Sequence, residues 1–236
     1  RWQVARSELE FPVWDPAFFL DDDKRLYLYW GCSNTNPIYG IQVEYENNFS
    51  LIGDPVELVH ANPQQHGWEV PGDNNNKRGQ APWIEGAWMN KHNGTYYLQY
   101  SGPGTEYKSY CDAVYISQHP LGPFQVQPHN PFAYKPEGFA AGAGHGSTFY
   151  DEYGNLWHMG TITISQKHVF ERRLGLYPAF FDTEGTLYSI TKYADYPLIL
   201  PKQKITGFND IFPGWMLLSY NKPLTVSSAV DSLPAE

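Results

Sequence analysis

The sequence has little charge, few cysteines and no long apolar run. Charged residues make up 17% of the 236 residues, and no stretch approaches the ~18 consecutive apolar residues that a membrane-spanning helix needs. Lys and Arg number 16 against 25 Asp and Glu, which gives a net charge of −9. This shortage of positive charge argues against nucleic acid or an anionic membrane as a partner. The two cysteines, Cys32 and Cys111, do not diagnose a compartment, and they form either a disulfide or two small buried side chains.

Aromatic residues, glycine and proline are abundant instead. Aromatic residues make up 17% of the chain, which also has 21 glycines and 19 prolines. The apolar and aromatic content is enough to offset the entropy cost of folding, so the chain is not disordered. The frequent glycines and prolines argue against long helices. Trp and Tyr side chains, with an apolar face and a polar edge, suit neutral, hydroxyl-rich ligands.

Four segments have the pattern of β-hairpins, in which two apolar, aromatic runs flank a turn. An acidic stretch forms the first turn, and Asn93–Gly94, Tyr153–Gly154 and Glu184–Gly185 form the others. The four predicted hairpins cover residues 16–31, 86–102, 146–161 and 178–191.

The first three hairpins share a register. Each is preceded by a polar residue and has an aromatic residue twelve positions later, and the pairs are Asp15 with Tyr27, Glu85 with Tyr97, and His145 with Trp157. A second hairpin-like pair follows each one, and two hairpins make the four-stranded sheet of a propeller blade. The sequence therefore predicts an all-β β-propeller of about three and a half to four blades. The alternative is a β-sandwich with coincidental spacing.

Equivalent positions of successive blades face one another at a propeller axis. The repeat would therefore place Asp15, Glu85 and His145 together, as a constellation suited to acid/base chemistry. Glycoside hydrolysis in particular uses paired carboxylates. Each residue also has a structural interpretation, because an Asp before Pro often forms a turn and a His among glycines is often buried.

Several neighbours of the two carboxylates are candidates for contacting a ligand. Residues 60–82 form a long polar loop, and a loop of this length is usually functional or disordered. We expect it to carry Trp68 and Gln80 toward the Glu85 side of the propeller. Trp14 and Trp83 flank the carboxylates. Either tryptophan could stack on a sugar ring or pack in the core, and Trp83 is favoured as the sugar-stacking residue because it lies two positions before Glu85.

Three segments together resemble glycoside hydrolase family 43. They read WDPAFFLDDDKRLYLYWG, APWIEGAWMNKHNGTYYLQYS and GHGSTFYDEYGNLWHMG, and they are similar to the second, third and fourth blades of that family. The resemblance implies a five-bladed β-propeller and an inverting enzyme that acts mostly on arabinofuranosides and xylosides.

The resemblance also assigns roles to residues. Glu85 matches the general acid, and Asp15 matches the aspartate that orients the acid and modulates its pKa. His145 matches the axial histidine, which in some members lies beside a calcium or another ion, here reached through water. Arg172 matches an arginine that contacts substrate, and Trp83, Trp14 and Gln80 complete the expected substrate site.

The chain departs from the family pattern at both ends. The family's general base is an aspartate of the first blade, and only fourteen residues precede Asp15. We therefore expect the base to lie outside residues 1–236 and this chain alone to have little activity, unless Asp15 itself is the base. Residues 219–236 resemble the opening of a discoidin-like carbohydrate-binding module, with a polar linker as the alternative. The expected domains are a partial propeller of blades two to four with a closing segment, residues 1–215, and a linker or module start, residues 216–236.

The sequence thus predicts an exo-acting, inverting glycoside hydrolase that releases terminal α-L-arabinofuranosyl or β-D-xylosyl units from a polysaccharide or oligosaccharide. The alternative is a carbohydrate-binding propeller without catalysis. No cofactor is expected to be required, although the resemblance allows a structural calcium at the axis. The resemblance also implies a secreted or periplasmic location.

Overall fold

The computed structural model describes residues 4, 9, 11–164, 171–195, 200–207 and 210. These residues form thirteen strands in three antiparallel sheets, and the only helices among them are the short 3-10 turns η1 (Gly67–Glu69) and η2 (Thr191–Asp195). No helix in this part of the chain is long and apolar enough to cross a membrane.

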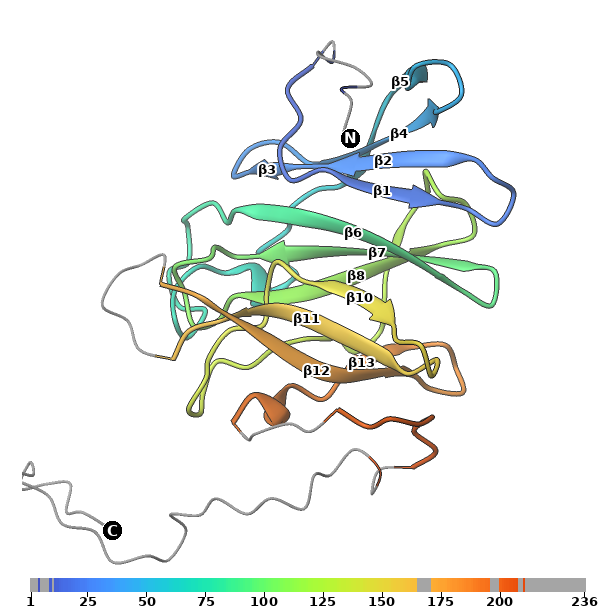
Figure 1. Ribbon diagram of the computed structural model, residues 1–236. Helices are drawn as coiled ribbons and strands as arrows, with labels where there is room; N and C mark the ends of the chain where they lie inside the picture. Colours follow the sequence, from blue (N-terminus) through green and yellow to red (C-terminus); the bar gives the residue numbers. More distant parts are fainter. Residues whose placement is uncertain are drawn as a thin grey trace, which may run out of the picture.

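The three sheets follow one another along the chain and lie one above the other (Figure 1). The first has the order β1 (Ala17–Leu20), β2 (Leu26–Trp30), β4 (Ile38–Glu44), β5 (Ser50–Val59). The second has the order β3 (Cys32–Ser33), β6 (Ile84–His92), β7 (Thr95–Gly102), β8 (Cys111–Ser117), β9 (Gln125–Val126). The third has the order β10 (Ser147–Tyr150), β11 (Leu156–Ile162), β12 (Arg173–Phe181), β13 (Leu187–Ser189).

All four predicted hairpins are present, as β1–β2, β6–β7, β10–β11 and β12–β13. The turn between β6 and β7 illustrates why the sequence folds this way. Asn93 and Gly94 both have positive φ, 48° and 82°, and a two-residue turn with this backbone matches the twist of the flanking strands. The described residues complete three sheets of the three and a half to four blades that the sequence predicts, and residues 211–236 lie outside the described part. The predicted linker or module, residues 216–236, lies outside the described residues.

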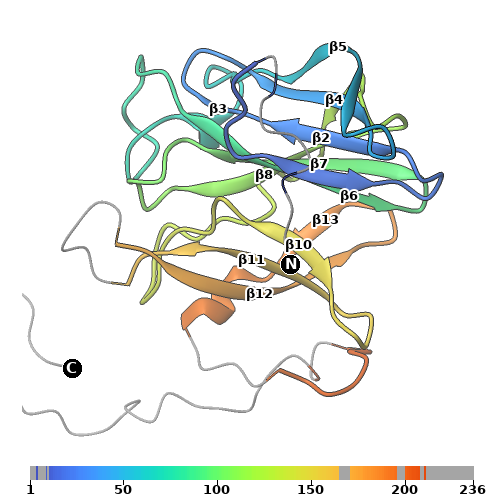
Figure 2. The same cartoon turned by 45° about the horizontal axis from the view of Figure 1, so that its top comes forward.

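The core lies between the sheets. Tyr96 of β7 belongs to the apolar cluster shared by the first and second sheets, and its neighbour Tyr97 belongs to the cluster shared by the second and third. The alternation of side chains along a strand thus lets the middle sheet bury both faces. Figure 2 shows the same layering from a second direction.

Two expectations about individual residues are settled here. Cys32 and Cys111 are both free, so no disulfide joins them. Trp68 does not reach the ligand site as expected, because its ring stacks on His66 at 4.5 Å and its Nε1 donates to the Tyr100 hydroxyl at 3.2 Å. The fully buried Glu69, which accepts a hydrogen bond from Tyr100 Oη at 2.5 Å, anchors this loop on the second sheet.

Candidate active site

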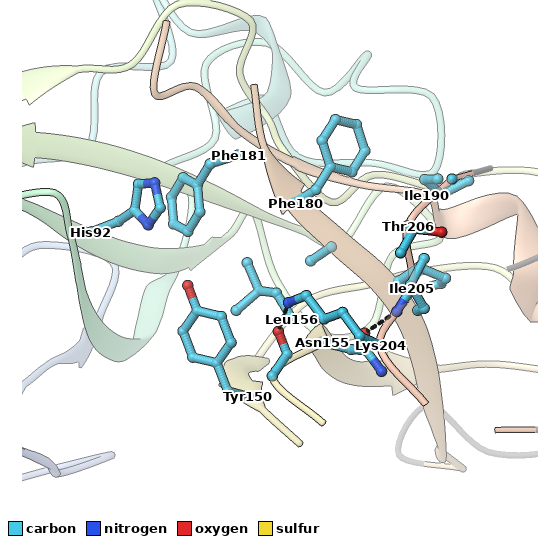
Figure 3. A pocket seen from close by; sticks show the side chains of 14 residues that line it. His92, Tyr150, Asn155, Leu156, Phe180, Phe181, Ile190, Lys204, Ile205 and Thr206 are labelled. Atoms are coloured by element: carbon cyan, nitrogen blue, oxygen red, sulfur yellow. Dashed lines mark hydrogen bonds between the residues drawn. The ribbon is translucent and has the colours of Figure 1, made fainter. Parts of the chain in front are cut away.

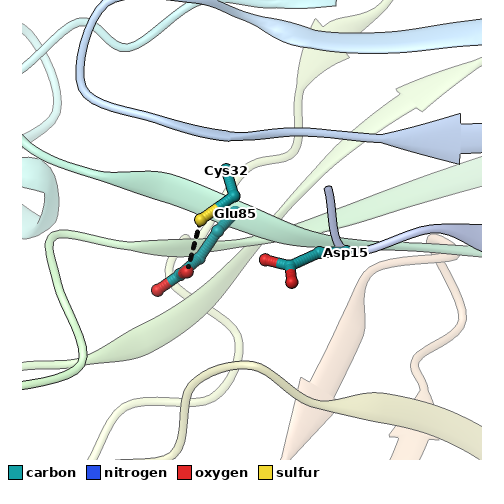
Figure 4. A group of neighbouring side chains, drawn as sticks. All are labelled: Asp15, Cys32 and Glu85. Carbon is teal, nitrogen blue, oxygen red and sulfur yellow. Dashed lines mark hydrogen bonds between the residues drawn. The ribbon is translucent and has the colours of Figure 1, made fainter. Parts of the chain in front are cut away.

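The shared register brings the three repeated polar residues together at the starts of three strands. Asp15 lies just before β1, Glu85 is the second residue of β6, and His145 lies just before β10. One side-chain oxygen each of Asp15 and Glu85 and the sulfur of Cys32 all lie within 4.8 Å of one another (Figure 4). His145 Nε2 is 3.9 Å from Asp15 Oδ2. The sequence-predicted proximity is therefore observed, and Cys32 is an additional member.

The backbone at these positions is unusual for residues other than glycine. Asp15 and His145 both have φ of 50°, in the left-handed region that costs energy for most side chains and that recurs at functional sites. Glu85 lies at a β-bulge, because Glu85 pairs with Ser101 while Trp88 pairs with Gln99. A bulge re-aims the side chains beside it, and this one allows Glu85 to turn toward Cys32.

Two donors hold the carboxyl group of Glu85. The Tyr110 hydroxyl donates to Oε1 at 2.6 Å, and the Cys32 thiol donates to Oε2 at 3.2 Å. Burial, followed by the charge and hydrogen bond of Glu85, raises the pKa of Tyr110 far above its ordinary value. Burial also raises the pKa of the Cys32 thiol, and Glu85 and Asp15 add to this effect. Both groups therefore keep their protons at neutral pH and act as donors to Glu85.

Asp15 has the opposite environment. Its Oδ2 is buried and has no hydrogen-bond partner among the described residues. An inverting enzyme keeps its acid and base carboxyl groups ~6.5–9.5 Å apart, with one water between them. Asp15 and Glu85 approach more closely than this, since oxygens of the two groups lie within 4.8 Å. The spacing suits a neighbour that orients Glu85 and does not suit a base that activates water.

The remaining predicted residues lie at the surface. The Trp14 and Trp83 residues are 67% and 43% exposed, so both rings are available to a ligand. Gln80 is exposed and lines a separate cavity of about 330 Å³ in the polar loop. Arg172 donates from Nη1 to the Thr105 hydroxyl at 2.7 Å, which places it beside the chain that connects β7 to β8.

Two larger cavities differ in their relation to this site. One of about 410 Å³ is lined by Trp14, Trp30 and Cys32 and therefore opens beside the carboxylates. Another of about 560 Å³ is lined by His92, Tyr150 and Phe181 among others, as Figure 3 shows. His92 ends the strand in which Glu85 is the second residue, so this larger cavity belongs to the opposite end of β6.

The family resemblance allows a calcium ion, and the candidate ligands at this site are Asp15, Cys32 and Glu85. Calcium takes six to eight oxygen ligands. Asp15 and Glu85 offer carboxylate oxygens, but the third group beside them is the thiol of Cys32, which is a poor ligand for calcium. The set of Asp15, Glu85 and Cys32 therefore fits calcium poorly.

Tyr110 and Cys32 were not identified from the sequence. Tyr110 precedes β8, outside the repeated hairpins, and no pattern marks it. Cys32 had a signal, since it lies two residues beyond β2 and pairs in the antiparallel sense with Glu85. The sequence signal is that Cys32 continues the Leu-Tyr-Leu-Tyr-Trp strand after Gly31, so the chain there could be expected to pair with the second sheet.

The stacked four- and five-stranded sheets, with Asp15, Glu85 and His145 at or near the starts of β1, β6 and β10, define a propeller of the glycosidase type. The sequence profile of Glycosyl hydrolases family 43 matches residues 4–187, so the chain belongs to this family. The fold prediction is confirmed by solved structures. An endo-1,4-β-xylanase of Bacteroides thetaiotaomicron covers 78% of this chain with 25% identity and a TM-score of 0.63, and 62% of that protein is covered. A thermostable family-43 glycoside hydrolase gives 22% identity and the same TM-score, with 78% of this chain and 59% of that protein covered.

Curated relatives match over about half of this chain. A β-D-galactofuranosidase of Aspergillus niger is 31% identical over 115 residues, which are 48% of this chain and 27% of that protein. A β-xylosidase of Xylanibacter ruminicola is 28% identical over 140 residues, covering 48% of this chain and 39% of that protein. The chain therefore matches less than half the length of either relative.

Proposed function

We propose that the protein is an inverting glycosidase in which Glu85 is the proton donor. The observation that carries this proposal is the placement of the Glu85 carboxyl group. It is half-buried, held by Tyr110 and Cys32, and within 4.8 Å of a second carboxylate, Asp15. The closeness of Asp15 and Glu85 provides the paired carboxyl groups that glycoside hydrolysis uses.

The proposed reaction breaks the bond between the anomeric carbon and the glycosidic oxygen. Glu85 transfers its proton to the departing oxygen, while water attacks the anomeric carbon from the opposite face and gives its proton to a general base. Asp15 orients Glu85, and His145 lines the axis beside them. Trp14 and Trp83 offer rings for stacking on sugar, and Gln80 and Arg172 are proposed to contact more distant parts of the substrate. The general base is proposed to lie outside residues 1–236.

The proposed substrates are terminal β-D-xylosyl or α-L-arabinofuranosyl units of a polysaccharide or oligosaccharide, released by exo action. The xylosidase name of one relative supports a pentoside, and the galactofuranosidase name of another supports a furanoside. A polymeric substrate of this kind fits a secreted or periplasmic protein with an appended carbohydrate-binding module. No cofactor is required for this chemistry, and a calcium ion beside His145 stays a prediction.

The test compares Glu85→Gln with the matched variant Glu184→Gln in the full-length protein. Glu184 lies exposed in the turn between β12 and β13, so its change controls for the loss of one carboxylate. We expect Glu85→Gln to lower kcat by about 10²–10⁴-fold on aryl xylosides or arabinofuranosides with poor leaving groups. A substrate with a good leaving group needs less protonation, so its hydrolysis should fall far less. Glu184→Gln should retain normal rates on both.

Two measurements separate this proposal from carbohydrate binding without catalysis. Calorimetry should show that Glu85→Gln still binds oligosaccharide, because ground-state contacts survive the loss of the proton. NMR of the first product formed should show inversion at the anomeric carbon. Near-normal rates of Glu85→Gln on the poor leaving groups would refute the role of Glu85. Sugar binding by the unmutated full-length protein without any turnover would establish the non-catalytic alternative.

A further inference from the structure

A continuous set of buried polar groups joins the second sheet to the third, behind the candidate site. Its central side chains are at most 1% exposed, and they are Gln99, Ser101, Asp112, Thr148 and His158. Polar groups buried this completely need hydrogen-bond partners. A carbonyl oxygen can only accept, so donor and acceptor can be assigned for each hydrogen bond in a connected set that begins at such an oxygen.

The direction of these bonds is fixed at the Thr148 carbonyl oxygen, which can only accept. Asn90 must present its Nδ2 to this oxygen, at 3.0 Å, so its Oδ1 faces Gln99. Gln99 must then donate from Nε2 to Asn90, at 2.6 Å, which turns its Oε1 toward the Thr148 hydroxyl. That hydroxyl donates to Gln99 Oε1 at 2.7 Å and has no further hydrogen to give.

His158 therefore has to donate from both ring nitrogens. Its Nδ1 lies 3.2 Å from the Thr148 hydroxyl oxygen, whose hydrogen is already used. Its Nε2 lies 3.3 Å from the Ala143 carbonyl oxygen, which can only accept, and 3.1 Å from Asp112 Oδ2. An imidazole with two N–H groups is the positively charged imidazolium.

Asp112 accepts two hydrogen bonds through its side-chain oxygens, as a carboxylate does, from the Ser101 hydroxyl at 2.5 Å and the Gly146 amide at 2.9 Å. Its Oδ2 also lies 3.1 Å from His158 Nε2. The Ser101 oxygen in turn accepts the amide N–H of His145 at 2.7 Å, where the backbone has its left-handed φ of 50°. The contact between His158 and Asp112 and these hydrogen bonds together link His158 to the backbone of a residue in the candidate site.

We propose that Asp112 and His158 form a buried ion pair across the two sheets, and that through Ser101 this pair positions His145 beside Asp15. His145 Nε2 lies 3.9 Å from Asp15 Oδ2, and its Nδ1 lies 3.4 Å from the Tyr110 hydroxyl that holds Glu85. Asp112, His158 and Ser101 are positioning residues. Ser101 contacts His145 through its hydroxyl and pairs with Glu85 between β6 and β7, and Asp112 contacts Ser101 and the Gly146 amide. The positioning of His145 relates to the proposed glycosidase function, whereas the ion pair is independent of it.

The charge on His158 is tested by long-range ¹H–¹⁵N NMR of the imidazole rings at about pH 7, where an exposed histidine is mostly neutral. The spectra of a His158→Gln variant assign the signals. We expect protons on both ring nitrogens of His158, and we expect Asp112→Asn to remove one of them. A singly protonated ring in the unmutated protein would overturn the ion pair, even if Asp112→Asn failed to fold. A ring that stayed doubly protonated in a folded Asp112→Asn variant would overturn the role of Asp112.

The positioning role is tested with Ser101→Ala against Ser109→Ala. Both serines are fully buried, but Ser109 donates to the Gly72 carbonyl oxygen and lies outside this set of bonds. Ser101→Ala should shift the ring signals of His145 and lower kcat by about tenfold or more with little change in KM, since ~1 Å of misplacement can cost about 10²-fold. Ser109→Ala should change neither. Unshifted His145 signals in Ser101→Ala would overturn the positioning role. Absence of turnover in the unmutated protein would count against the proposed function alone.

Discussion

Strand β1 has an aspartate at each end, and the two have opposite surroundings. Asp15, before the strand, faces another carboxylate and has a buried oxygen with no hydrogen-bond partner in the described part of the chain. Asp21, after the strand, receives Lys91 Nζ at 2.6 Å and the Tyr96 hydroxyl at 2.5 Å. Both aspartates bridge the first and second sheets, one at the start of β6 and the other near its end.

The different surroundings of Asp15 and Asp21 distinguish a residue of the candidate active site from a residue that stabilises the fold. A buried polar group without a partner costs stability, so it persists where another function requires it. A carboxylate beside a cation and a hydroxyl donor stabilises the fold and leaves no capacity for a ligand. We therefore expect changes at Asp15 to alter turnover and changes at Asp21 to alter stability.

The largest expected effect is on turnover in Asp15→Asn. We expect kcat of the full-length protein to fall by about 10²-fold, because Glu85 loses the neighbouring carboxylate that orients it. The free energy of unfolding should stay the same or rise, since the substitution removes a carboxylate whose Oδ2 is buried without a hydrogen-bond partner among the described residues. Denaturant titration and steady-state kinetics on the same sample check both halves. Unchanged turnover together with a clear loss of stability would make Asp15 a structural residue.

A smaller effect, and of the opposite kind, is expected for Asp21→Asn. Loss of the charged hydrogen bonds to Lys91 and Tyr96 should lower the free energy of unfolding by about 1.5–3 kcal/mol without changing kcat. Asp22→Asn is the matched control. Asp22 also contacts Lys91, at 3.0 Å, but its side chain is 87% exposed, so its loss should change stability little. Equal effects of the two variants on stability would show that burial of Asp21 is unimportant.

The stabilisation by Asp21 should also depend on pH in a defined direction. Burial opposes ionisation of Asp21, but hydrogen bonds from Lys91, Tyr96 and the Asp22 amide outweigh it and lower its pKa. Its contribution is therefore fully present above the unfolded pKa of about 3.9 and is lost as pH falls through the lower, folded pKa. Denaturant titrations at a series of pH values should show the unmutated protein and Asp21→Asn converging below about pH 4. A difference that stayed constant to pH 2 would contradict this assignment.

The features that repeat along the sequence could be predicted from it. The twelve-residue offset placed Asp15, Glu85 and His145 at equivalent strand starts, and the turn residues placed the four hairpins. It could not foretell Tyr110, which donates to Glu85 from a segment outside the repeat. The ion pair of Asp112 and His158 could not be predicted either, because it depends on how two sheets pack and no local sequence pattern indicates it. Trp68 was misplaced for the same reason, since a tryptophan in a polar loop looks the same in sequence whether it faces a ligand or the core.

The smallest expected effect concerns the Cys32 thiol, which lies beside the carboxylates of Glu85 and Asp15. Burial raises the pKa of Cys32 most, and the hydrogen bonds and charges of Glu85 and Asp15 raise it further. Alkylation by iodoacetamide requires the thiolate, so Cys32 should react slowly at about pH 8. Glu85→Gln or Asp15→Asn removes one negative charge, lowers the pKa of Cys32 and should speed its alkylation several-fold. Asp21→Asn should not, because Asp21 lies at the other end of β1. Mass spectrometry of the Cys32 peptide over time measures these rates. Equal rates in all four proteins would mean that burial alone protects the thiol and that the carboxylates at this end of β1 exert no charge effect on it.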